Sequence, residues 1–227
     1  MRRTLLTWLG IIVALPLLVG TEYVSAEVIT FDLLSPNTAI NAYPSPFANV
    51  SINRTDSTHA TVTFQSLVTG GNQYLMGDGS TVALNVNATG FTVGTVAESN
   101  SLGSPFTPTW IATNTAPGQQ VDGWGTFNLT VDNFDGFHDS ATNVQFTLTN
   151  TSGSWFNALS VLLPNSGGSS AAAHIFVCTA GSCNAALATG YASNVAPVPA
   201  PAALFLFGSG LMGLAGHLWR RRSAPVA

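Results

Sequence analysis

The chain has 227 residues, which allows one or two domains, and its six basic residues are all arginine. Between residues 27 and 196 a single cation, Arg54, stands against nine carboxylates, which gives this segment a net charge of −8. A surface of this kind repels phosphate backbones, so the composition argues against nucleic acid as a partner.

The first 26 residues have the three-part pattern of a secretory signal peptide. Two arginines open the chain, residues 5–19 are almost wholly apolar, and small residues precede the predicted cleavage site after Ala26. The alternative is an uncleaved membrane anchor. The apolar core is short for a membrane span, so we favour a cleaved signal peptide and export of the chain.

Residues 27–193 are expected to form one extracellular β-domain. Apolar residues alternate there with Thr, Asn and Ser, as in half-buried strands, and helix signals are nearly absent. The spacing predicts clear strands at residues 60–68, 82–87, 91–96, 126–131 and 144–149, and weaker strands at 28–34, 109–112, 158–163 and 175–178. About nine strands in one domain indicate an all-β fold, an antiparallel β-sandwich of jelly-roll type.

The chain has two cysteines, Cys178 and Cys183, separated by four residues. Outside the cytoplasm such a pair is expected to form a disulfide. Closing so small a loop stabilises a fold by about 2 kcal/mol on the chain-entropy model. A metal site is a weaker alternative, because zinc needs four ligands and His174 is the one histidine nearby. Free thiols are the remaining alternative.

Residues 132–139 contain the densest cluster of potential metal ligands. The carboxylates of Asp132, Asp135 and Asp139 could hold Ca²⁺, although their spacing does not match an EF-hand loop. A polar turn at Asp135-Gly136 is the simpler interpretation. We therefore expect no metal and no other cofactor, with Ca²⁺ as the alternative.

No arrangement of residues predicts catalysis. Nine acids in one domain give carboxylate pairs by composition alone, so such pairs carry no weight without geometry. Three histidines could each assist a serine, but the chain has no Gly-x-Ser-x-Gly motif. These histidines are His59, His138 and His174. We expect a non-enzymatic protein.

Six aromatic side chains are candidates for stacking on sugar rings, because the CH faces of sugars pack well on aromatic planes. A place in the core is the favoured interpretation for each of them. They are Tyr74, Trp110, Trp124, Phe134, Phe137 and Trp155.

The segment after the domain has the pattern of a tethered membrane helix. Residues 194–201 carry prolines at alternate positions, which favours an extended linker. Residues 202–219 are uncharged, and as a helix of about 27 Å they match the hydrocarbon thickness of a bilayer. Three arginines then begin a short cytoplasmic tail, residues 220–227, and place the β-domain outside the cell. A permanent anchor is the main alternative, and a buried core helix is disfavoured because the segment is apolar on every face.

Three features in this segment occur in a characteristic order. A Val-Pro-x-Pro sequence is followed by glycines that allow close helix approach and then by the arginine cluster. The residues are Val198, Pro199, Ala200, Pro201, Gly208, Gly210, Gly213, Arg220, Arg221 and Arg222. This pattern resembles the PEP-CTERM protein-sorting domain, in a variant with Ala200 where glutamate is usual.

The resemblance implies an exosortase as partner, an integral-membrane cysteine transpeptidase of Gram-negative bacteria that make exopolysaccharide. It also implies release or attachment of the protein at the cell surface or in its matrix. We therefore expect an exported, exosortase-processed surface or matrix protein associated with exopolysaccharide. The alternatives are a permanently anchored glycan-binding module and a secreted glycan-active enzyme.

Overall fold

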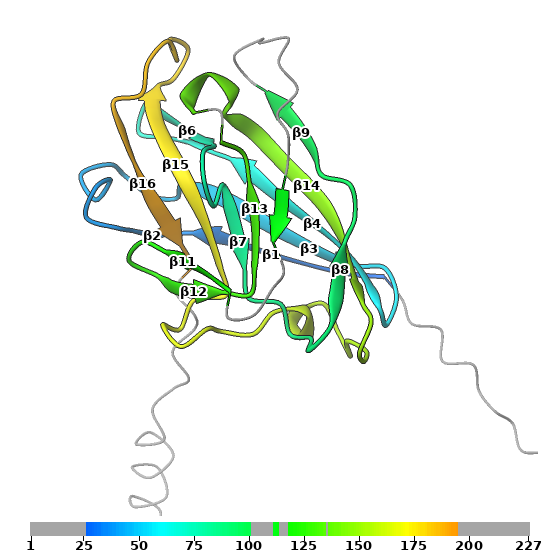
Figure 1. Cartoon of the computed structure of the whole chain (residues 1–227). Coiled ribbons are helices and arrows are strands. Elements are labelled where there is room, and N and C mark those ends of the chain that lie inside the picture. Colours follow the sequence, from blue (N-terminus) through cyan, green and yellow to red (C-terminus); the bar gives the residue numbers. More distant parts are fainter. Residues whose placement is uncertain (1–25, 101–110, 114–117, 135, 195–227) are drawn as a thin grey trace, which may run out of the picture.

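The computed structural model describes residues 26–100, 111–113, 118–134 and 136–194. This part of the chain is all-β, with two short 3-10 helices, and its paired strands are antiparallel (Figure 1). The predicted all-β antiparallel class is confirmed. None of the helical turns within these ranges has the length and apolar composition of a membrane span. The predicted membrane helix and, apart from Ala26, the predicted signal peptide lie outside the described residues.

Fourteen strands join one large sheet, and two more form a separate hairpin. The strands are β1 (Glu27–Leu33), β2 (Ser35–Pro36), β3 (Ala48–Arg54), β4 (His59–Ser66), β5 (Val68–Thr69), β6 (Asn72–Met76), β7 (Val82–Leu84), β8 (Phe91–Val93), β9 (Ala97–Asn100), β10 (Ile111–Thr113), β11 (Gln119–Val121), β12 (Gly125–Phe127), β13 (Leu129–Asp132), β14 (Ala141–Asn150), β15 (Ala171–Thr179) and β16 (Ala188–Ser193). The helices are η1 (Phe137–Asp139) and η2 (Leu159–Val161).

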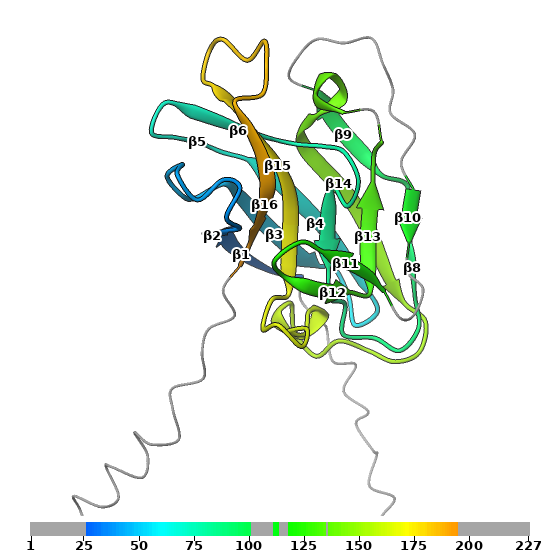
Figure 2. The same ribbon diagram turned by 60° about the vertical axis from the view of Figure 1, so that its left-hand side comes forward.

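The sheet follows the order β1-β3-β4-β14-β6-β15-β7-β13-β10, with β16 beside β15 and both β8 and β9 beside β14. It turns where Met76 of β6 pairs with Ala141 of β14. As Figures 1 and 2 show, β1, β3 and β4 form one wall, and β15, β16 and β7 form the other. One core cluster takes side chains from both walls, among them Val50, Ile52, Val62, Phe64, Leu84, Ile175 and Val177.

Strand β15 is buried on both faces, unlike the alternating strands β3 and β4. Its inner side chains join the main core. On the outer face Ala172 packs against Val121 and Phe127 of the β11–β12 hairpin, and Phe176 meets Phe137 of η1 at 5.5 Å between ring centroids. The run of apolar residues at 171–178 is typical of a doubly buried strand, which is why the alternation rule found only residues 175–178.

Several predicted strands are confirmed, with altered ends. Strands β1, β4 and β14 lie at the predicted positions 28–34, 60–68 and 144–149, and β7, β8 and β10 occupy parts of 82–87, 91–96 and 109–112. A turn at Gly70 and Gly71 closes the β5–β6 hairpin with φ of 58° and 80°, the left-handed conformation that glycine permits.

One predicted strand is wrong, and another is divided into two strands. Residues 158–163 contain helix η2, because Asn157 and Ser160 bond each other's backbone: Ser160 N donates to Asn157 Oδ1 (2.8 Å) and Asn157 N donates to Ser160 Oγ (3.0 Å). Residues 126–131 are split between β12 and β13 at Asn128. Its side-chain amide pairs with the backbone of Val86 at 2.7 and 2.8 Å, which fixes the chain where it passes from the hairpin to the sheet.

Candidate functional site

The last two described residues, Ser193 and Asn194, are hydrogen-bonded to the start of β15. Asn194 is buried, and its Oδ1 accepts hydrogen bonds from the backbone N–H groups of Ser170 (3.0 Å) and Ala171 (2.9 Å). Its Nδ2 donates to Ser170 Oγ (2.8 Å), and Ser193 Oγ donates to Ala171 O (2.7 Å). Asn194, the first residue of the predicted linker, is therefore held by the domain. The segment with the predicted sorting residues follows it in the sequence.

The carboxylate of Asp132 is engaged inside the protein. Its Oδ1 accepts the backbone N–H of Ser80 (2.6 Å) and its Oδ2 accepts the hydroxyl of Thr130 (3.1 Å). Burial raises the pKa of Asp132, and the bonds from Ser80 and Thr130 counteract that rise. The neighbouring Asn133 donates from Nδ2 to the backbone oxygen of Asp139 (2.8 Å), which ties the two ends of this turn together.

The Ca²⁺ alternative at Asp132, Asp135 and Asp139 stays a prediction, because Asp135 lies outside the described residues. Within the described ranges no group of three or more His, Cys, Asp or Glu side chains is placed to hold a metal ion. Both Asp132 and Asp139 are buried. In the described structure the Asp132 oxygens bond to Ser80 and Thr130.

Glu98 is an acidic residue that was not among the predicted site residues. It lies on β9 opposite Val144 of β14, and its Oε2 is buried with no hydrogen-bond partner among the described residues. Burial and, to a smaller extent, the negative charge of Asp139 together raise the pKa of Glu98 to about 7. This side chain therefore takes up or releases a proton near neutral pH.

Replacing Glu98 with glutamine is expected to remove a pH dependence of stability. The folded pKa of about 7 lies above the ordinary value of 4.5, so the folded state binds more protons between these values. Stability then falls as pH rises from 4.5 to 7. Because the carboxyl is partly open to solvent, which screens it, we expect a loss of only about 1 kcal/mol. Urea unfolding of wild type and E98Q at pH 4 and pH 8 measures it, and an equal difference at both pH values would contradict the assignment.

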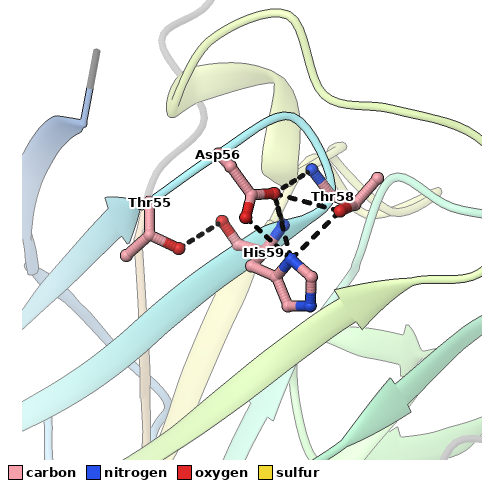
Figure 3. Close-up of polar contacts among 4 residues, drawn as sticks. All are labelled: Thr55, Asp56, Thr58 and His59. Carbon is pink, nitrogen blue, oxygen red and sulfur yellow. Dashed lines mark hydrogen bonds and ion pairs between the residues drawn. The ribbon is translucent and has the colours of Figure 1, made fainter. Parts of the chain in front are cut away.

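Asp56 and His59 form the most closely bonded acid–histidine pair in the described structure (Figure 3). They lie in the β3–β4 turn, where Asp56 Oδ1 accepts the backbone N–H groups of Thr58 (2.7 Å) and His59 (2.8 Å). His59 Nδ1 lies 2.9 Å from Asp56 Oδ2. The Thr58 N–H and then the His59 ring hold the pKa of Asp56 well below its usual range.

The geometry of this pair is that of a turn. The hydroxyl that contacts His59 belongs to Thr58, and it meets Nδ1 at 3.0 Å, the same nitrogen that faces Asp56. A Ser-His-Asp relay needs the hydroxyl and the carboxylate on opposite ring nitrogens. Asp56 therefore closes the hairpin as an Asx turn, and the four residues in Figure 3 do not form a nucleophilic site.

The other two candidate histidines differ in exposure, since His174 is partly buried and His138 is exposed. His174 packs against Tyr191 with ring centroids 4.5 Å apart, and its Nε2 lies 2.8 Å from Thr189 Oγ1. Burial lowers the pKa of His174, and the backbone of Gly77 and the charge of Asp78 raise it in part. His138 is exposed on η1. His174 is thus a packed side chain on the outer face of β15.

Most of the candidate sugar-stacking aromatics belong to the core. Tyr74 and Trp155 are fully buried, and Trp124 and Phe137 pack against the outer-face clusters of β15. Only Phe134 among the described candidates is well exposed, at 64%. Trp110 lies outside the described residues. The structure therefore brings no two of the described candidates together on an exposed face.

The predicted disulfide between Cys178 and Cys183 is confirmed, with the two Cα atoms 5.1 Å apart. It closes the turn after β15, and Cys183 packs against the cluster of Leu75, Phe176 and Cys178. The bond joins this turn to the outer face of the sheet. Such a bond is typical of a protein that folds in an oxidising compartment.

Comparison with known families identifies the C-terminal segment. Residues 197–222 match the family model of the PEP-CTERM protein-sorting motif, which confirms the resemblance. The matched range spans all the predicted sorting residues and lies outside the described part of the chain. No curated protein and no solved structure matches the chain. The motif implies exosortase-dependent sorting, with export and a transient membrane stage on the way to the cell surface.

Proposed function

We propose that this chain is a non-enzymatic protein of the cell surface or extracellular matrix, processed by an exosortase and associated with exopolysaccharide. Residues 1–26 direct export, and residues 202–219 hold the precursor in the cytoplasmic membrane. The exosortase then separates the β-domain from the membrane helix. The observation that carries this proposal is the sorting motif at residues 197–222.

The β-domain supports a location outside the cell. It contains the Cys178–Cys183 disulfide, and its one cation, Arg54, is buried with Nη2 at 3.9 Å from Glu27. The charge on its surface is therefore carried by carboxylates, which keeps the protein soluble at neutral pH. The association with exopolysaccharide rests on what the sorting family implies about the bacteria that carry exosortases.

The arrangement of the sheet supports a β-sandwich as the finer description of the fold. Two walls of antiparallel strands enclose one core, as in a sandwich, and β14 and β6 join the walls at Met76 and Ala141. The non-enzymatic role is supported by the polar clusters described above. In these clusters the carboxylates accept backbone N–H groups, Asp132 from Ser80 and Asp56 from Thr58 of its own turn.

Deleting the exosortase gene of a host that processes this chain is expected to hold the protein in the membrane fraction. With the enzyme present, most of the protein should reach the cell surface or the medium. Immunoblots of both fractions, with a domain-specific antibody, measure the distribution. The same distribution in both strains would contradict the proposal and favour a permanent anchor.

A further inference from the structure

Three large apolar side chains are exposed along one loop at one end of the domain. They are Phe156 (89% exposed), Leu159 (66%) and Leu163 (50%), and we call them the apolar tip. All three lie between β14 and β15, in the loop of residues 151–170. Large exposed apolar side chains that share one loop can mark a surface that contacts a membrane or another molecule.

The loop itself is firmly held, so the exposure of the tip is built into the fold. Trp155 is buried and donates from Nε1 to the backbone oxygen of Asn87 (2.9 Å). Leu162 is buried and forms a bridge with Val86. Apolar side chains thus alternate between anchors that enter the core and tip residues that point to solvent. Folding of the domain does not need the tip to be apolar.

The tip is also free of charge. From Ser140 to Ala173 the sequence contains no Asp, Glu, Lys, Arg or His. The carboxylate bonded to this loop belongs to Glu27, which accepts the N–H of Ala158 (2.9 Å) and lies 3.9 Å from Arg54. A neutral surface with an aromatic and two leucines has the composition that enters the headgroup region of a bilayer at low cost.

The loop that carries the apolar tip is hydrogen-bonded to residues at both ends of the described β-domain. Ala158 bonds to Glu27 at the start of β1, and Ser170 and Ala171 bond to Asn194 just after β16. Figure 2 shows the loop at the end of the domain where β16 finishes. The seven residues from 195 to 201 precede the expected membrane helix and reach at most about 25 Å when fully extended. The end of the domain that carries the tip is therefore the end tethered to the membrane.

We propose that Phe156, Leu159 and Leu163 rest on the outer leaflet of the cytoplasmic membrane while the precursor is anchored. This inference depends on the proposed membrane stage of the chain. Contact of the tip with lipid keeps Asn194, and the motif that follows it, close to the membrane surface. An integral-membrane enzyme can reach the motif there, and cleavage releases the domain because three side chains alone hold a protein only weakly at a bilayer.

The test uses the full-length chain reconstituted in vesicles of phosphatidylethanolamine and phosphatidylglycerol. An environment-sensitive fluorophore is attached to Leu159→Cys at the tip, with the native disulfide intact. The matched control is Val68→Cys on β5, which is similarly exposed at 61% and lies away from this loop (Figure 2). Brominated lipids quench fluorophores that enter the bilayer. We expect about threefold stronger quenching at position 159 than at position 68, and a smaller difference when Phe156→Ser and Leu163→Ser are added.

The outcomes separate this inference from the proposed function. If the chain floats with the vesicles but both labels are quenched equally, the membrane stage stands and the inference is overturned. If quenching at position 159 is replaced by self-quenching that grows with protein density, the tip binds a second copy, and the inference is again overturned. A chain that does not float with the vesicles would overturn both.

Discussion

Replacing Pro199 and Pro201 together with alanine is expected to block maturation of the exported chain. Both residues lie in the matched sorting motif, and alternate prolines favour an extended backbone and disfavour a helix. The change would give an alanine-rich run at residues 199–203, and alanine has the highest helix propensity, so the membrane helix could extend into the recognition segment. The sorting enzyme would then meet a helical substrate.

We expect the amount of mature protein at the cell surface to fall at least about tenfold, the factor that corresponds to a loss of ~1.4 kcal/mol in recognition. The precursor should accumulate in the membrane fraction. The matched control is Pro225→Ala, which lies beyond the matched residues 197–222 and should mature normally. Normal maturation of the double variant would show that the prolines have no part in recognition.

Replacing Trp155 with alanine is expected to lower the free energy of unfolding by about 3–5 kcal/mol, the usual cost of truncating a buried aromatic residue. The side chain is 2% exposed, and its truncation leaves the Asn87 oxygen without the Nε1–H donor. The backbone bond from Trp155 N to Ser57 O (2.6 Å) does not involve the side chain, so alanine can still form it.

The next residue along the chain supplies the control. Phe156 is 89% exposed, so Phe156→Ala should change stability by no more than about 0.5 kcal/mol. Urea unfolding of the purified mature protein measures both variants. Similar losses in the two variants would mean that Phe156 is a core residue, and this would also remove the basis of the apolar tip.

The sequence predicts best the strands that have one buried face and one exposed face. In β14, Val144, Phe146 and Leu148 enter the core while Gln145 and Thr147 face outward, so alternation in the sequence reports the structure directly. Strand β3 has the same pattern in Val50 and Ile52 but was not predicted, although the signal is present.

Other strands depend on partners that the sequence places far away. Strand β15 has no alternation because the β11–β12 hairpin and η1 cover its outer face, and neither contact is local. Strand β6 was not predicted, because Tyr74, Leu75 and Met76 are buried in succession and do not alternate. Strand β16 was not predicted either, because its buried residues Gly190, Ala192 and Ser193 are small and give no clear apolar alternation.

The sorting motif could be predicted because its features follow one another along the chain. The roles of Glu98 and Asn194 could not, because they arise from contacts with residues distant in sequence: Asp139 for Glu98 and Ser170 for Asn194. The sequence also does not predict that Trp155 is buried while Phe156 is exposed. Two adjacent aromatic residues are equivalent in composition, and only the fold decides which one is buried.

The intact mass of the mature protein, purified from the cell surface or the medium, tests the central claim most directly. Exosortase processing predicts a chain that begins at Glu27 and lacks the membrane helix and everything after it, with a new C-terminus close to Pro199. A mass that still includes Trp219 and the arginines at 220–222 would contradict the account and identify a permanently anchored protein.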